Sequence, residues 1–233
     1  MKWLLFYGLL ILTRIFSDVP LFWMFYSLHF QEEGRGGISN AVFNGVLFVS
    51  FGVIHSLMAR NRVKKYVAKL VGDDLVRIVY VVIAGVTLSL VLHLWRPVGG
   101  MVWHTQGILY WILSVLYLGL IGGIIYSTFF IDYLEFIGIR HILRKMKNRS
   151  PKAPRFSAKG PYAHCHHPMY LFLFMALWVG PVMTVGRFEF ALFGSAYLVV
   201  GTFLEEGNLR EELGEVYDIY RANVPMWIPQ LRP

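Results

Sequence analysis

Six apolar segments dominate the sequence, and each approaches the length that a helix needs to cross a lipid bilayer. They lie at about residues 3–28, 41–58, 76–95, 108–131, 168–186 and 188–204. A helix crosses about 30 Å of hydrocarbon with roughly 20 mostly apolar residues. The last two segments are short, and only Gly186 and Arg187 separate them, which predicts a tight turn within a helical hairpin. We therefore expect an all-α polytopic membrane bundle of five to six transmembrane helices.

Basic residues are concentrated in two of the connecting segments. One group follows the second apolar segment and the other follows the fourth: Arg60, Arg62, Lys64, Lys65, Lys69 and Arg77, then Arg140, Arg144, Lys145, Lys147, Arg149, Lys152, Arg155 and Lys159. The alternate loops contain only Arg35, Arg96 and Arg187. This positive-inside pattern predicts that both termini and both basic segments are cytoplasmic. The net charge of +8 therefore reflects topology, with anionic lipid headgroups rather than nucleic acid as the expected partner.

The first apolar segment begins like a secretory signal peptide, with Lys2 before an apolar stretch. No small-residue cleavage site follows it, and Arg14 and Asp18 interrupt it, so we expect a retained first span. Arg14 and Asp18 are one helical turn apart, which predicts an ion pair inside the bundle. Cys165 is the only cysteine, so an internal disulfide is excluded.

The composition changes once along the chain, in a basic segment at residues 140–160 that contains Pro151 and Pro154. We expect this segment to connect an N-terminal four-span region, residues 1–140, with a C-terminal region, residues 141–233. Because five or six spans leave no room for a separate soluble domain, the two regions should form one membrane domain.

Two further helices are expected at the membrane surface. The basic stretch from Phe136 to Lys147 predicts an interfacial helix. After the last apolar segment, one face of a second helix is apolar and the opposite face is charged. Its apolar face contains Leu209, Leu213, Val216, Tyr217 and Tyr220. This amphipathic cytoplasmic helix should end before Val224-Pro225.

A polar turn with three histidines precedes the fifth apolar segment. It runs from Gly160 to Tyr170 as GPYAHCHHPMY, and a carboxylate pair, Glu205-Glu206, ends the sixth segment. Ionisable groups at the ends of membrane helices are costly unless they bind a partner. We therefore expect a polar site at the cytoplasmic membrane surface.

Three kinds of site suit these residue types. Imidazoles of His164, His166 and His167 are metal ligands, but their spacing matches no usual ligand pair, so no metal is predicted. A nucleophile pair of Cys165 and His166 is disfavoured because adjacent side chains diverge. A pocket for a zwitterionic cofactor fits better, since carboxylates suit an ammonium or sulfonium group and tyrosine rings suit cations. Pro168 would orient backbone donors at the helix start.

The C-terminal third contains an ordered set of short motifs. They are Gly160-Pro161-Tyr162, His167-Pro168-Met169-Tyr170, Glu205-Glu206, Leu213-Gly214, Val224-Pro225 and Ile228-Pro229. This set resembles the integral-membrane methyltransferases, which include the isoprenylcysteine carboxyl and phospholipid methyltransferases. Segments such as His55 to Arg60, Trp95-Arg96-Pro97 and Met183 to Gly186 extend the resemblance to the bacterial methanethiol S-methyltransferases over most of the chain.

The resemblance implies methyl transfer from S-adenosylmethionine to a small thiol such as methanethiol, giving a thioether such as dimethyl sulfide. The family's cofactor contacts carry over to Tyr162, His167, Pro168, Met169, Tyr170, Glu205 and Glu206. His166 stands where the family usually has Arg, so a fixed cation is replaced by a group that titrates near neutrality. The stretch from Ala196 to Leu204 lacks the basic residue with which the prenylcysteine enzymes bind a carboxylate, which favours a neutral thiol.

Methyl transfer from a sulfonium needs alignment and exclusion of water more than covalent help. A thiol must still lose its proton, and the candidate acceptors are His55, His166 and Asp132. His55 also suits a helix-packing role. Three alternatives remain: a lipid, isoprenoid or larger thiol acceptor; haem ligation by His55 and His93; and a non-catalytic relative. The sequence gives no oligomeric state.

Overall fold

The computed structural model describes residues 2–147 and 157–230, which form two compact units. The first unit comprises Met1–Phe30, Gly34–Gly99 and Tyr133–Ala153, and the second comprises Gln31–Glu33, Gly100–Asp132 and Pro154–Pro233. The basic residues Arg149, Lys152 and Arg155 and the prolines Pro151 and Pro154 lie outside the described residues. The predicted division of the chain at residue 140 stays a prediction.

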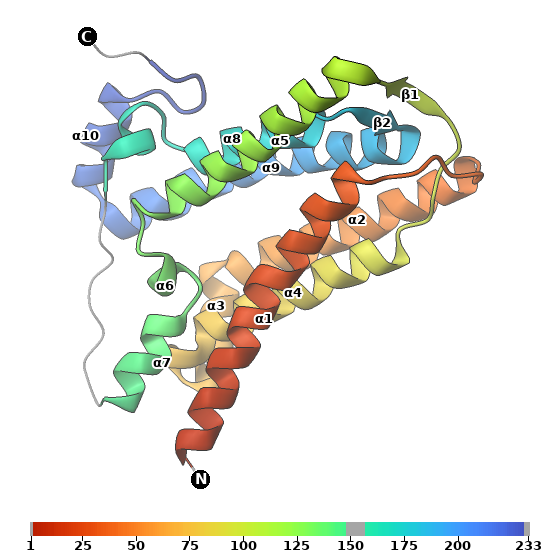
Figure 1. The fold of residues 1–233 in the computed structure, drawn as a ribbon. Helices are drawn as coiled ribbons and strands as arrows, with labels where there is room; N and C mark the ends of the chain where they lie inside the picture. The colour runs from red at the N-terminus through yellow and green to blue at the C-terminus, as the bar shows by residue number, and fades with distance from the viewer. Residues whose placement is uncertain (1, 148–156, 231–233) are drawn as a thin grey trace. The chain divides into compact units, whose positions relative to one another are not determined.

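Long helices that pack side by side build the first unit (Figure 1). Its elements are α1 (Lys2–His29), α2 (Ile38–Ala59), α3 (Asn61–Val71), α4 (Asp73–Leu94), α6 (Tyr133–Phe136) and α7 (Ile139–Met146). Helix α4 packs against both α1 and α2, and α7 contacts α1 and α4. Gly85 allows the closest approach of α4 to α1, because a Cβ atom there would lie 2.1 Å from the Phe16 carbonyl oxygen.

The predicted ion pair in α1 is present, but its Arg14 and Asp18 side chains are 48% and 36% exposed and do not lie inside the bundle. The Arg14 guanidinium lies 2.5 Å from the Asp18 carboxylate. The Tyr133 hydroxyl also donates a hydrogen bond of 2.7 Å to Asp18 Oδ1, so α6 is attached to α1 by a polar contact. The two charges therefore neutralise each other within one helix.

Three apolar helices and a small sheet build the second unit (Figure 1). Its elements are β1 (Met101–His104), α5 (Gly107–Thr128), the 3₁₀ turn η1 (Gly160–Ala163), α8 (Pro168–Trp178), β2 (Val182–Thr184), α9 (Val185–Leu213) and α10 (Glu215–Asn223). Helix α8 packs against α5 and α9, and α10 packs against α9. Strands β1 and β2 pair antiparallel at one end of these helices, with Trp103 opposite Met183.

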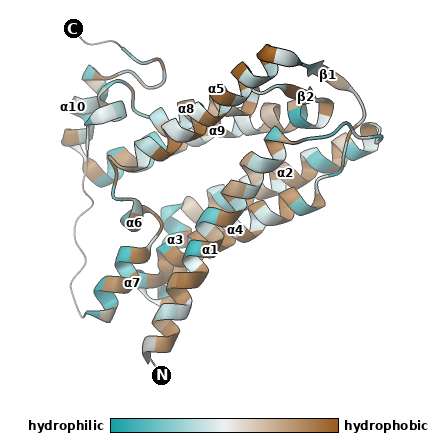
Figure 2. Ribbon diagram, viewed as in Figure 1, coloured by the Kyte–Doolittle hydropathy of each residue, from teal (hydrophilic) through white to brown (hydrophobic). Residues whose placement is uncertain are grey.

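Within the described residues, five helices are long and apolar enough to cross a membrane: Leu4–His29 within α1, and α2, α4, α5 and α9. Hydrophobic residues, coloured brown, recur along the length of these helices in Figure 2. Large apolar side chains point outward from them, with Phe22 73% exposed, Ile38 80% and Trp111 66%. Exposing so much apolar surface to water is energetically unfavourable, whereas exposing it to lipid is not. The protein is therefore an integral membrane protein with the predicted all-α bundle.

The predicted tight turn at Gly186 and Arg187 is wrong, because both residues lie in the first turn of α9. Thr184 caps that helix, since its hydroxyl accepts a hydrogen bond of 3.0 Å from the Arg187 backbone N–H. The Arg187 side chain is fully buried and donates to the carbonyl oxygens of Val179 and Val182 at 2.7 and 2.9 Å. Arg187 therefore closes the end of α8 from inside and does not mark an exposed loop.

Helix α8 has 11 residues and is about 16 Å long, so it is too short to cross a bilayer as one helix. At the other end of the unit, α9 continues to Leu213, beyond the predicted span. Gly214 separates α9 from α10 with φ +58° and ψ −136°, a conformation that side-chain-bearing residues rarely adopt. The predicted amphipathic helix is therefore split, and Leu209 and Leu213 of α9 pack against the tyrosines of α10.

The basic segments form helices as well. The stretch at 136–147 contains the shorter helix α7, which Gly138 precedes with φ +89°, and its predicted interfacial position stays a prediction. The segment after α2, for which the sequence predicted only a basic loop, forms helix α3.

Candidate functional site

The histidine turn is fixed from both sides before α8 begins. On one side, the backbone N–H of His166 donates to the Pro225 carbonyl at 2.9 Å, and that of Gln230 donates to the His164 carbonyl at 3.2 Å. On the other side, Pro168 occupies the first turn of α8, where its missing N–H costs no helical hydrogen bond. The C-terminal segment after α10 thus holds the turn in place.

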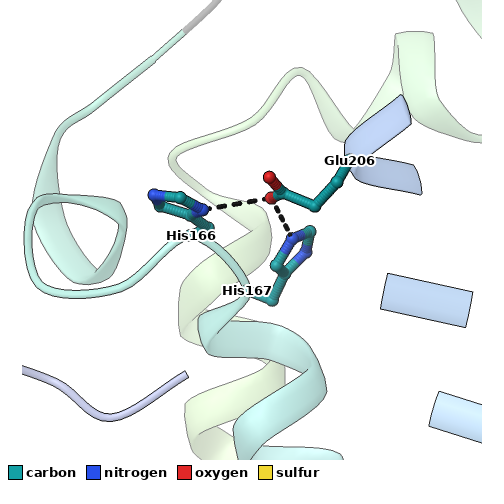
Figure 3. Close-up of side chains that lie close together, drawn as sticks. All are labelled: His166, His167 and Glu206. Atoms are coloured by element: carbon teal, nitrogen blue, oxygen red, sulfur yellow. Dashed lines mark hydrogen bonds and ion pairs between the residues drawn. The ribbon is translucent and has the colours of Figure 1, made fainter. Parts of the chain in front are cut away.

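Glu206 of α9 accepts hydrogen bonds from both adjacent histidines (Figure 3). His166 Nδ1 lies 3.0 Å and His167 Nε2 lies 2.8 Å from the same oxygen, Glu206 Oε1. All three side chains are nearly inaccessible to solvent, at 3%, 5% and 6% exposed. An ionised carboxylate has no proton to donate, so each histidine carries a proton on the nitrogen that faces Glu206.

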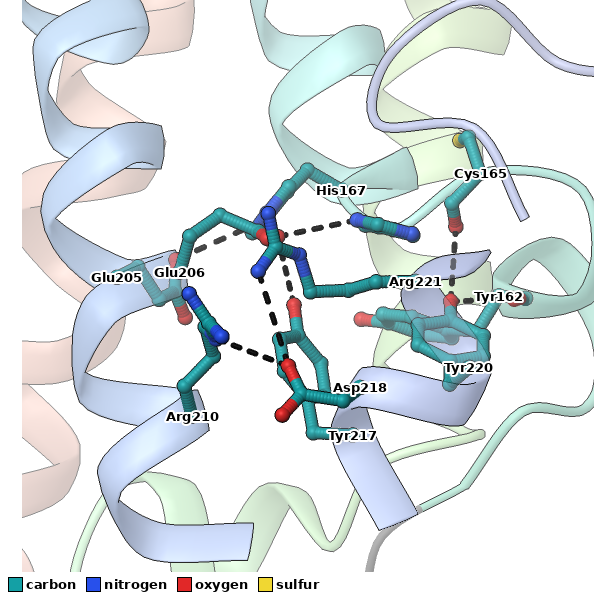
Figure 4. A network of polar contacts seen from close by, with 11 residues as sticks. Tyr162, Cys165, His167, Glu205, Glu206, Arg210, Tyr217, Asp218, Tyr220 and Arg221 are labelled. Carbon is teal, nitrogen blue, oxygen red and sulfur yellow. Dashed lines mark hydrogen bonds and ion pairs between the residues drawn. The ribbon is translucent and has the colours of Figure 1, made fainter. Parts of the chain in front are cut away.

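Two residues of α10 complete the surroundings of Glu206 (Figure 4). The Tyr217 hydroxyl donates to Glu206 Oε1 at 2.6 Å, and Arg221 Nε lies 2.7 Å from Oε2. Asp218 accepts from Arg210 Nε at 2.9 Å, which connects α10 to the end of α9 a second time. A buried carboxylate is stable when charged donors and hydrogen bonds surround it, and Glu206 has both.

The tyrosines of α10 keep their protons and act as donors. Burial raises the pKa of Tyr217, and its hydrogen bond with the Glu206 carboxylate raises it further. The Tyr220 hydroxyl donates to the backbone carbonyl oxygen of Tyr162 at 2.6 Å, so α10 also holds the turn η1. Burial, followed by the nearby Glu205 charge, raises the pKa of Tyr162.

Glu205 and Glu206 are adjacent in sequence and differ in environment. The Glu205 side chain is 39% exposed, whereas that of Glu206 is 6% exposed. Glu205 Oε2 lies 3.7 Å from His167 Nδ1. Among the residues that the structure describes, this buried oxygen has no hydrogen-bond partner. Glu206 thus has four close contacts, to His166, His167, Tyr217 and Arg221, whereas the contact given for Glu205 in the described part of the chain is the longer one to His167.

Aromatic rings flank the same cluster. The ring of Tyr170 stacks on that of His167, with centroids 5.4 Å apart and an interplanar angle of 21°. The His166 ring lies 4.9 Å from that of Tyr220. These rings fix the planes of both imidazoles, so the histidines present defined nitrogens.

The structure places most of the predicted site residues in one region of the second unit. The turn before α8 contains Tyr162, His166 and His167, and the start of α8 contains Pro168, Met169 and Tyr170. The C-terminal part of α9 contains Glu205 and Glu206. Asp132 lies in the turn that follows α5. His55 lies in α2 of the first unit, where its Nε2 is 2.6 Å from the Tyr80 hydroxyl.

Sequence reasoning missed Arg221 as a member of the site. The helical pattern places it on the charged face of the C-terminal helix and gives it no role in the site. Its spacing of four residues from Tyr217 was the available signal, because residues four apart lie on the same face of a helix.

No protein-family model matches the chain, and no solved structure matches it. Methanethiol S-methyltransferase of Pseudomonas deceptionensis is 36% identical over 188 residues, which cover 80% of this chain and 72% of that protein. The Mycobacterium tuberculosis protein of the same name is 32% identical over 192 residues, covering 81% and 78%. Nurim of Xenopus laevis is 31% identical over 196 residues, covering 78% and 65%. The chain belongs to the methanethiol S-methyltransferase family.

Proposed function

We propose that this protein transfers a methyl group from S-adenosylmethionine to the sulfur of a small thiol such as methanethiol, giving dimethyl sulfide or a related thioether. The division between Glu205 and Glu206 is the observation that supports this most strongly. Glu206 orders the site through four contacts, and Glu205 keeps a buried oxygen for a cationic ligand. Relatives named for this reaction are 32–36% identical to the chain.

The donor set suits S-adenosylmethionine. A carboxylate such as Glu205 suits the ammonium or sulfonium group, and the faces of Tyr162 and Tyr170 suit a cation or an aromatic base. Pro168 and Met169 begin α8 beside them and supply backbone and apolar surface. When bound, S-adenosylmethionine supplies a methyl group that its positive sulfur already activates.

The remaining site residues prepare the acceptor. Because Glu206 holds the proton on His166 Nδ1, the other nitrogen of that ring, Nε2, is a bare lone pair. His166 Nε2 has no hydrogen-bond partner among the described residues. We assign it the thiol proton: the thiol S–H bond breaks and His166 becomes the imidazolium, while the thiol sulfur gains the methyl group as the methyl–sulfonium bond breaks and S-adenosylhomocysteine leaves. His167 positions Glu206 through a hydrogen bond, and its ring stacks against the ring of Tyr170. Asp132 and His55 remain candidate acceptors of that proton.

The membrane orientation is part of the proposal. The basic helices α3 and α7 suit the anionic headgroups of a cytoplasmic leaflet. We place both termini and the polar site on that side of a bacterial inner membrane. The cofactor then reaches the site from the cytoplasm, and an apolar thiol reaches it from the bilayer.

The test is an assay of purified protein with S-adenosylmethionine and methanethiol, with dimethyl sulfide measured by gas chromatography. We expect Glu205→Gln to weaken S-adenosylhomocysteine binding at least tenfold by calorimetry, and His166→Gln to slow turnover with little change in that binding. Glu212→Gln is the matched control, because Glu212 is an exposed carboxylate of the same helix. No dimethyl sulfide from wild type, with normal S-adenosylhomocysteine binding, would exclude methanethiol as acceptor.

A panel of larger thiols, isoprenoid thiols and phospholipids then separates the other acceptors. The absence of a Soret band in the purified protein would exclude the haem alternative. Failure of wild type to bind S-adenosylhomocysteine would instead indicate a non-catalytic relative.

A further inference from the structure

Three buried side chains of the second unit offer ligand atoms to one point. His166, His167 and Glu206 each present one nitrogen or carboxylate oxygen, and these atoms all lie within 4.8 Å of one another. The two imidazoles come from the turn before α8 and the carboxylate comes from α9, 39 and 40 residues away. Figure 3 shows both rings directed at the same carboxylate oxygen.

We propose that His166 Nδ1, His167 Nε2 and the Glu206 carboxylate bind one divalent first-row transition ion, with Zn²⁺ the best suited. Two imidazoles and one carboxylate are a donor set that zinc takes in proteins, with one position left open. Bonds of about 2.0–2.1 Å in a tetrahedral site separate neighbouring ligand atoms by about 3.3 Å. The two nitrogens already lie 3.0 and 2.8 Å from Glu206 Oε1, so small ring movements admit an ion.

Glu205 supplies the outer partner that a ligating histidine requires. Metal-bound imidazoles almost always donate their second N–H to a carboxylate or carbonyl. Once His167 Nε2 binds an ion, its ring proton moves to Nδ1, which faces Glu205 Oε2 at 3.7 Å. Among the described residues that buried oxygen has no donor, so ion binding satisfies an atom that is otherwise unpaired.

Glu206 is held as a ligating carboxylate would be. Tyr217 donates to Oε1 at 2.6 Å, the oxygen that both histidines face, and Arg221 contacts Oε2 at 2.7 Å, so these two residues fix the orientation of the carboxylate toward the imidazoles. The local charge also suits a dication. Arg221 pairs with Glu206 and Asp218, Arg210 pairs with Asp218, and Glu205 lies beside His167, so the three carboxylates outnumber the two guanidiniums by one.

The test uses the full chain, purified without a histidine tag, because such a tag binds the same ions. Protein is loaded with Co²⁺ as an absorbing substitute for Zn²⁺, freed of excess ion and measured by metal analysis and visible absorption. We expect one Co²⁺ per chain in wild type, with the intense visible bands of a four-coordinate site. His166→Asn and Glu206→Gln should weaken binding at least 100-fold, and Glu205→Gln should weaken it 10- to 100-fold.

His164→Asn is the matched control, because His164 lies in the same turn and its ring contacts only the Gln230 carbonyl among the bonds described. It should bind Co²⁺ as wild type does. Retention of less than 0.1 ion per chain by wild type, or equal binding by His166→Asn and wild type, would overturn the proposal. Where a variant fails to fold, X-ray absorption of zinc-loaded wild type decides. Two imidazoles in the first shell support the site, and a shell of water oxygens alone refutes it.

The ion site shares His166, His167 and Glu206 with the reaction proposed above, but its test is independent of that reaction, since the Co²⁺ experiment contains neither thiol nor methyl donor. Loss of methyl transfer therefore leaves its outcome unaffected. Conversely, a chain that binds no ion can still bind S-adenosylhomocysteine and methylate a thiol.

Discussion

The Tyr217 hydroxyl donates a hydrogen bond of 2.6 Å to Glu206 across the break between α9 and α10. This contact joins a helix that is long enough to cross the membrane to the short helix that follows it. It is also one of four contacts that hold the central carboxylate of the site. The position of α10 and the order of the site are therefore coupled.

Tyr217→Phe tests that coupling. The substitution removes one donor from a buried carboxylate, and hydrogen bonds to charged groups are worth about 1.5–3 kcal/mol. We expect a loss of about 2 kcal/mol in unfolding free energy, measured in detergent, and weaker S-adenosylhomocysteine binding. Tyr66→Phe is the control, because Tyr66 is 65% exposed on α3. Equal stability of Tyr217→Phe and Tyr66→Phe would contradict the coupling.

Gly214→Ala tests the break itself. Gly214 has φ +58°, and a Cβ atom there would meet no other atom within 4 Å, so backbone strain is the only penalty. We expect a destabilisation of about 1–2 kcal/mol, with loss of the α10 contacts to Glu206. We expect Gly207→Ala to change the stability in the opposite direction. Gly207 lies inside α9 with open space around it, so alanine there should stabilise by about 0.5–1 kcal/mol. Similar melting temperatures for the two variants would argue against strain at Gly214.

Much of the fold follows from composition alone. Four of the apolar segments correspond to α1, α2, α4 and α5, because long apolar stretches have few alternatives in lipid. The last third was harder to predict. Thr184 and Arg187 act through contacts with residues that are near in space. The charge of Arg187 therefore predicts an exposed loop from the sequence, whereas in the structure it is buried at a helix end.

The candidate site was predictable in membership but not in roles. The motif identified the turn and the acidic pair, but it could not show that Glu206 is buried with four close contacts whereas Glu205 is 39% exposed and lies 3.7 Å from His167. The metal ligands were hidden for a related reason. Two of them are adjacent histidines, and the third is 39 residues beyond the nearer one, so no sequence spacing connects them.

Arg187→Gln tests the buried cap of α8. The change leaves the carbonyl oxygens of Val179 and Val182 short of donors, and each buried unsatisfied group costs about 1–3 kcal/mol. We expect a loss of about 3 kcal/mol in unfolding free energy. Arg35→Gln, at an exposed arginine, should change stability by less than 0.5 kcal/mol. A melting curve of Arg187→Gln that overlays wild type would refute a structural role.

Cys165 should be chemically inert in the folded protein. It is 1% exposed, and burial raises the pKa of its thiol, so the reactive thiolate is scarce near neutral pH. We expect maleimide to label it at least 100-fold more slowly than a free thiol at pH 7. Because the pKa of this thiol is raised in the folded state, its contribution to the free energy of unfolding is fully present below the unfolded pKa. That contribution is lost as the pH rises through the folded pKa. Cys165→Ser should keep methyl transfer and lose less stability at alkaline pH. Rapid labelling of native protein would contradict this burial.

Zinc should inhibit methyl transfer if His166 accepts the thiol proton. An ion on His166 Nδ1 moves the ring proton to Nε2, which can then no longer accept one. With free zinc buffered to saturate the site, we expect turnover to fall at least tenfold and to recover when a chelator is added. His164→Asn should show the same inhibition at the same free zinc. Raising the thiol concentration at fixed free zinc tests whether zinc instead lowers turnover by binding the thiol substrate. Unchanged turnover at a zinc concentration that fills the site by spectroscopy would exclude His166 as the proton acceptor.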